Sequence, residues 1–114
     1  MENPTTPPKD LDDEFTEVWW RAKFALQEQG TWDDDDAPLL DSYARALQAS
    51  RKAARVVTKE GPFARGLEGE LIEHPALEIE RNEGRAALDY ATTLLITPAA
   101  REQYRRDNEG EIDD

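Results

Sequence analysis

Residues 38–62 read PLLDSYARALQASRKAARVVTKEGP, and this segment fits one long α-helix together with its end. Alanine, leucine, arginine and lysine dominate it, and these residue types favour helix. Apolar side chains recur at helical spacing along one side, namely Leu40, Tyr43, Leu47, Ala54 and Val57. Gly61 followed by Pro62 prevents the helix from continuing, whereas Pro38 is tolerated in a first turn. The segment therefore predicts a helix from about residue 38 to residue 60, with the apolar side facing the core.

The opposite side of this helix is basic. At about 100° per residue, four bases fall within about 80° of one another and Arg51 flanks them; the four are Arg45, Lys52, Arg55 and Lys59. No acid interrupts this face, and bases near phosphates release counterions and so give sequence-independent affinity for nucleic acid. These five residues are the candidate DNA-binding residues. The residues alone slightly favour the alternative, a solvated face that pairs with acids from a neighbour. No Asn, Gln and Arg cluster suited to reading bases accompanies the basic face.

A second helix is expected before the long one, over about residues 11–30. Its apolar stripe is Leu11, Phe15, Val18, Trp19, Ala22, Ala25 and Leu26. Asp12, Asp13 and Glu14 supply the negative charge that a helix N-terminus prefers, and Gly30 ends the helix.

Two aromatic residues of this helix lie off the stripe. Trp20 and Phe24 fall about 140° and 180° from Phe15 on the helical wheel, so the helix has two apolar faces. Either other helices of the same chain cover both faces, or the second face contacts another subunit. Large aromatic side chains on an acidic chain favour interfaces, so Trp19, Trp20 and Phe24 are the candidate oligomer contacts.

Two further helices are expected after Gly61. Residues 63–73 contain Gly66 and Gly69 among single apolar residues and predict a loop or a short hairpin. Pro75 begins the third helix, and Thr97 as N-cap with Pro98 as first residue begins a short last one. The sequence thus predicts an all-α fold, a small helical domain of about four helices, two of them long.

Composition bounds the domain and its tails. The 114 residues allow one domain, which we assign to residues 11–106. Residues 1–10 hold three of the seven prolines and predict a flexible leader, whereas residues 107–114 predict an acidic, disordered tail. Only 38% of residues are apolar and the formal net charge is -12, so a thin core favours burial against partner chains while like charge opposes assembly.

Catalytic and metal chemistry lack the necessary residues. The chain has no cysteine and one histidine, His74, which we interpret as an ordinary loop residue before Pro75. No phosphate-binding glycine loop is present, so we expect no catalytic site, no metal and no cofactor. There is also no membrane-spanning apolar run and no signal peptide, which predicts a cytoplasmic protein.

Four segments together resemble the small-subunit family of double-stranded DNA phage terminases. They are Leu39-Leu40-x-x-Tyr43-Ala44, the Gly61 break, His74-Pro75-Ala76-Leu77, and Leu94-Leu95-Ile96-Thr97-Pro98-Ala99-Ala100-Arg101. The resemblance covers about residues 32–106, and its most specific part is the leucine-rich helix end that leads into Thr-Pro-x-x-Arg. The family usually has glycine at the position of Leu95 and asparagine at that of His74.

The resemblance implies a non-catalytic protein of the bacterial host's cytoplasm. Such subunits assemble as rings, mark phage double-stranded DNA for packaging and deliver it to a large subunit with ATPase and nuclease activity. Trp19, Trp20, Phe24 and the long helix would build the ring, the basic face would contact DNA, and the acidic tail would contact the large subunit. The alternative is an acidic helical protein-binding module of the anti-restriction, DNA-mimic or antitoxin-like kind, which the net charge favours.

Overall fold

A computed structural model describes residues 5–112. In this range the chain forms α1 (Asp13–Gln29), a short 3-10 helix η1 (Asp34–Asp36), α2 (Ala37–Glu60), β1 (Phe63–Arg65), β2 (Leu71–Glu73), α3 (Pro75–Thr93) and α4 (Pro98–Ile112). The predicted all-α class is confirmed, with helix ends within about two residues of expectation for α1, α2 and the start of α3. Residues 63–73 form a hairpin, in which Ala64 of β1 is opposite Ile72 of β2 in an antiparallel pair.

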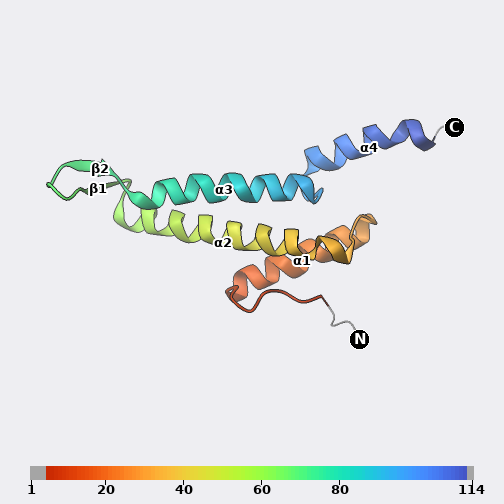
Figure 1. The fold of residues 1–114 in the computed structure, drawn as a ribbon, viewed down its shortest axis with the longest axis horizontal. Helices are drawn as coiled ribbons and strands as arrows, with labels where there is room; N and C mark the ends of the chain where they lie inside the picture. The colour runs from red at the N-terminus through yellow and green to blue at the C-terminus, as the bar shows by residue number, and fades with distance from the viewer. Residues whose placement is uncertain (1–4, 113–114) are drawn as a thin grey trace.

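The four helices form an elongated, flat molecule (Figure 1) with extents of 67 × 37 × 18 Å. α2 and α3 lie side by side and antiparallel, and the β1–β2 hairpin joins them at one end of the pair. α1 packs on the first half of α2, and α4 leads away from the end of α3.

The main core lies between α1 and the start of α2. It is built from Leu11, Phe15, Trp19, Ala22, Leu26, Leu40, Ala44 and Leu94. These residues include most of the apolar stripe predicted for α1. Trp19 is fully buried, and its indole Nε1 donates a 2.9 Å hydrogen bond to Asp41 in the first turns of α2. The indole N–H of Trp19, the largest side chain of the core, therefore has a hydrogen-bond partner.

α2 buries two sides rather than the single inner face that the sequence predicted. Leu40 and Ala44 face α1, whereas Ala46 and Ala53 are buried outside that core and lie on the side toward α3. Ala54 and Val57, expected inside, remain partly exposed. The prediction failed because alanines bury as readily as leucines when a second helix approaches closely, and hydropathy alone does not mark them.

The close approach of α2 and α3 depends on small residues. Ser50 Oγ donates a 3.1 Å hydrogen bond to the backbone carbonyl of Glu80 and lies 3.2 Å from the position that a Cβ on Gly84 would occupy. Gly84, which weakens α3 by propensity, thus allows the two backbones to come together. The side of α3 toward α2 is otherwise lined by buried alanines, namely Ala76, Ala87 and Ala91.

The structure describes residues 5–10 and 107–112 of the two expected tails. In the leader, Lys23 Nζ donates to the carbonyl of Thr5 at 3.3 Å. At the other end α4 continues to Ile112, beyond the limit expected at residue 106. Side-chain pairs one turn apart support this extension, since Arg105 pairs with Glu102 at 2.6 Å and Gln103 donates to Asp107 at 2.8 Å. Residues 1–4 and 113–114 of the expected tails lie outside the described range.

Candidate nucleic-acid interface

The five bases predicted to bind DNA are all exposed on α2. Four of them form a stripe along one side of the helix, which we call the basic stripe: Arg45, Lys52, Arg55 and Lys59. At about 1.5 Å per residue the stripe is about 21 Å long. The fifth base, Arg51, lies outside the stripe. Together with Tyr43 and Leu47 it lines an apolar groove of about 370 Å³ between α1 and α2.

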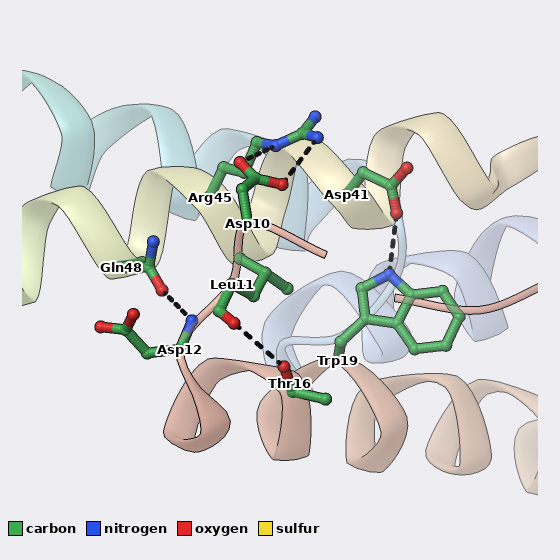
Figure 2. A network of polar contacts seen from close by, with 8 residues as sticks. All are labelled: Asp10, Leu11, Asp12, Thr16, Trp19, Asp41, Arg45 and Gln48. Carbon is green, nitrogen blue, oxygen red and sulfur yellow. Dashed lines mark hydrogen bonds and ion pairs between the residues drawn. The ribbon is translucent and has the colours of Figure 1, made fainter. Parts of the chain in front are cut away.

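Three carboxylates of the segment before and at the start of α1 lie against this stripe; we call Asp10, Asp12 and Glu14 the acidic strip. Arg45 donates to both carboxylate oxygens of Asp10, each at 3.1 Å, as Figure 2 shows.

The next two pairs follow along α2. Lys52 Nζ lies 3.0 Å from Asp12 Oδ2, and Arg55 Nη2 lies 2.6 and 3.0 Å from the two oxygens of Glu14. All six side chains of the three pairs are between 52% and 61% exposed, so water and ions reach every pair.

The ion pair between Asp10 and Arg45 shifts the pKa values of both groups. The hydrogen bond from Arg45, followed by one from the backbone, lowers the pKa of the Asp10 carboxyl, and Asp10 in turn raises the pKa of the Arg45 guanidinium. A carboxylate with a lowered pKa keeps its charge until the pH falls through that lowered value. The Asp10–Arg45 pair is therefore fully charged at neutral pH.

The backbone that carries the acidic strip is held in place by the core. Leu11, between the first two acids, is 7% exposed, and Thr16 Oγ1 donates to its carbonyl at 3.5 Å. The backbone N–H of Asp12 donates to Gln48 Oε1 on α2 at 2.8 Å (Figure 2). Sequence reasoning assigned Asp12 and Glu14 only to the helix dipole and missed their pairing with α2. The signal was available in part, since a face of bases with no acids on its own helix calls for acids from elsewhere.

The three candidate interface aromatics are separated by the fold. Trp19 is fully buried in the core of its own chain, so it is not available to a second subunit, which corrects the sequence assignment. Trp20 is partly buried, and Phe24 is 58% exposed. Their rings stack with centroids 5.9 Å apart and an interplanar angle of 25°. Of the three candidate residues, Trp20 and Phe24 are therefore the two that are accessible at the surface of the described chain.

His74 has a structural position. Its Nδ1 accepts a 3.0 Å hydrogen bond from the backbone N–H of Ala76, which caps the N-terminus of α3, and its Nε2 lies 3.0 Å from Glu60 Oε1. With Nδ1 as acceptor the ring proton is on Nε2 and is donated to Glu60. Among the described residues, no three potential metal ligands come together. In the same range no helix is long and apolar enough to cross a membrane.

A comparison with protein-family models gives a match over residues 16–111 to the family described as phage terminase, small subunit. The match spans nearly all of the chain. The chain belongs to the phage terminase small-subunit family. No curated protein and no solved structure matches it significantly. Membership gives this terminase small subunit a role in phage DNA packaging.

The most specific motif of the resemblance is formed as a turn between α3 and α4 of this terminase small subunit. Thr97 Oγ1 accepts a 3.1 Å hydrogen bond from the backbone N–H of Ala100, so Thr97 caps α4. Arg101 donates to the carbonyl of Ile96, which ties the start of α4 to the turn. The sharp bend is made although the chain has Leu95 in the glycine position of the family, and Leu95 adopts a φ of 65°.

Proposed function

We propose that this terminase small subunit assembles as a homo-oligomeric ring, binds phage double-stranded DNA through α2 and delivers it to the large terminase subunit. It acts without a catalytic site or a cofactor, in the cytoplasm of the bacterial host. The large subunit supplies ATPase and nuclease activity. The observation that supports DNA binding most directly is the exposed basic stripe, which no acid of α2 itself interrupts.

The length of the basic stripe suits a backbone contact rather than base reading. Over about 21 Å a duplex carries about twelve phosphates, so four bases meet a local excess of negative charge. Contacts of this kind are weak for one subunit and add across an assembly. Repetition around a ring adds these short-range contacts, which together must outweigh the long-range repulsion between DNA and the net charge of -12 on each subunit.

The stacked pair of partly buried Trp20 and exposed Phe24 supports assembly. Phe24 at 58% exposure is a large apolar side chain in water, and burying it against a second copy removes that area. The acidic residues after Arg106 are the proposed contact for the large subunit. Their first member, Asp107, is exposed on α4, which leads away from the helical body (Figure 1).

The test of DNA binding is a titration of double-stranded DNA with the wild-type protein and with the variant R45Q/K52Q/R55Q/K59Q. The control variant R21Q/R81Q/R85Q/R105Q removes four exposed bases from α1, α3 and α4 and changes the net charge equally. We expect the stripe variant to lose most of its affinity and the control variant to retain more of it. Equal affinities of the two variants would refute the basic stripe as the DNA contact.

The same titration addresses the alternative of an acidic protein-binding module. A DNA mimic would array its carboxylates on one continuous face, whereas several acids of this chain cap helices or pair with its own bases, as Asp33 and Asp10 do. Absence of DNA binding by the wild-type protein at low salt, with a DNA-binding enzyme captured instead, would favour the mimic.

A further inference from the structure

We infer that the acidic strip is a built-in competitor of DNA for the basic stripe, which lowers the affinity of each subunit for the phosphate backbone. The inference rests on the proposed binding of DNA by α2. Asp10, Asp12 and Glu14 occupy the cationic ends of Arg45, Lys52 and Arg55, so three of the four stripe bases are already paired with carboxylates.

The order of the three pairs matches along both partners. From Arg45 to Lys52 to Arg55 the stripe advances along α2 while the acids advance from Asp10 to Glu14. A carboxylate and a phosphate present the same kind of oxygen acceptors to a guanidinium or an ammonium group. The acidic strip thus holds three carboxylates along the basic stripe, at the positions that the phosphates of bound DNA would take.

The strip cannot leave the stripe as a loose tail would. Its backbone is fixed by the buried Leu11 and by the hydrogen bond from Asp12 N–H to Gln48, so the carboxylates stay near α2 even when their ion pairs are broken (Figure 2). The side chains themselves are more than half exposed and can rotate. DNA can therefore displace the carboxylates from the bases, but it binds next to three displaced negative charges.

This arrangement has a consequence for binding by single subunits. Each phosphate contact contributes about 0.9 to the slope of log affinity against log salt. A subunit that must break an ion pair for each phosphate contact gains less binding free energy from that contact. This applies to Arg45, Lys52 and Arg55, whereas Lys59 forms none of the ion pairs found in the described range. Stable binding then requires several subunits on one duplex, which restricts it to the assembled form.

The experiment compares the variant D10N/D12N/E14Q with the wild-type protein in titrations of a duplex of random sequence at several salt concentrations. The matched control is E68Q/E78Q/D89N, which removes three exposed acids of the hairpin turn and α3 and so changes the net charge by the same amount. We expect the strip variant to bind at least about tenfold more tightly than the control variant, with a steeper salt slope by up to about 2.7 for three freed contacts.

Each outcome decides one question. If the strip variant and the control variant gain affinity equally, long-range charge explains the gain and the competitor inference is wrong. If none of the proteins binds DNA, the proposed function fails. Circular dichroism during heating establishes that each variant is folded. The second variant is D10N, which lies before α1 and neutralises only the carboxylate that pairs with Arg45. By itself it must raise affinity above that of the single control D89N.

Discussion

Leu95 is the one non-glycine residue with a positive φ, 65°, in the part of the chain that the structure describes. It ends α3 with two hydrogen bonds, from its own N–H to the carbonyl of Thr92 at 3.1 Å and from Ile96 N–H to Ala91 at 2.8 Å. The same pair of bonds ends α1, where Gly30 has a φ of 84°. A left-handed backbone is disfavoured by about 1–2 kcal/mol for a residue with a Cβ, so Leu95 stores strain that Gly30 avoids.

The strain at Leu95 predicts that glycine and alanine rank in opposite orders of stability at position 95 and at an ordinary helical position. At position 95 glycine should be more stable than alanine by about 1 kcal/mol, because both remove the leucine side chain and only glycine fits the backbone. At exposed Thr92, inside α3, alanine should be more stable than glycine by about 1 kcal/mol. Urea unfolding of L95G, L95A, T92G and T92A measures both differences. Alanine at or above glycine at position 95 would mean that the turn is not strained.

The hydrogen bond between Trp19 and Asp41 predicts a second effect at this scale. D41A leaves the buried indole N–H without its acceptor, which costs about 1–3 kcal/mol of unfolding free energy. D41N keeps an acceptor oxygen and should cost less. The variant W19F/D41A removes donor and acceptor together, so the loss caused by D41A should shrink in the W19F background. An equal cost of D41A with tryptophan or phenylalanine at position 19 would contradict the role of this bond.

At the scale of elements, helices could be predicted because their signals are local. Gly30, Gly61 with Pro62, and Thr97 with Pro98 act on the turns that they occupy, and each marks a boundary in the structure. The two sides that α2 buries depend on residues of α1 and α3, and its bases pair with acids 35 to 41 positions away. Hydrophobic periodicity along one helix contains no information on which neighbour comes close. It put Trp19 on the main stripe and Trp20 off it, yet aromatic character alone assigned both to the interface.

The contact of Ser50 with Gly84 predicts coupling between α2 and α3. G84A adds helix propensity of up to about 1 kcal/mol, but its Cβ would lie 3.2 Å from Ser50 Oγ. Removing that oxygen with S50A relieves the crowding. We therefore expect G84A to stabilise the protein more in the S50A background than in the wild type, by about 0.5 kcal/mol or more in a double-mutant cycle. Additive effects would show that the helices are not in such close contact.

The whole molecule combines high negative charge with a small core and exposed apolar side chains. Several of these lie at the far ends of the flat body or on its outer faces, namely Phe24, Phe63, Leu67, Leu71 and Leu88. An isolated two-stranded hairpin such as β1–β2 is marginally stable in water and gains from packing on another surface. Composition predicts burial against a partner, and the structure shows which of the candidate aromatics is accessible to one, since Phe24 is 58% exposed and Trp19 is fully buried.

Assembly through the Trp20–Phe24 surface predicts the mass of the protein in solution. Light scattering of the wild type should give one oligomer well above 13.0 kDa. High salt should preserve or strengthen it, because subunits of charge -12 repel one another and salt screens that repulsion, while apolar contacts persist.

F24E introduces a charge into the proposed contact and should lower the mass toward that of the monomer. L88E is the control, because Leu88 on α3 is 59% exposed and Phe24 is 58% exposed, so the two substitutions perturb the monomer alike. A monomer at both salt concentrations would refute ring assembly of the isolated subunit, and an equal fall in mass for F24E and L88E would refute this surface as the contact.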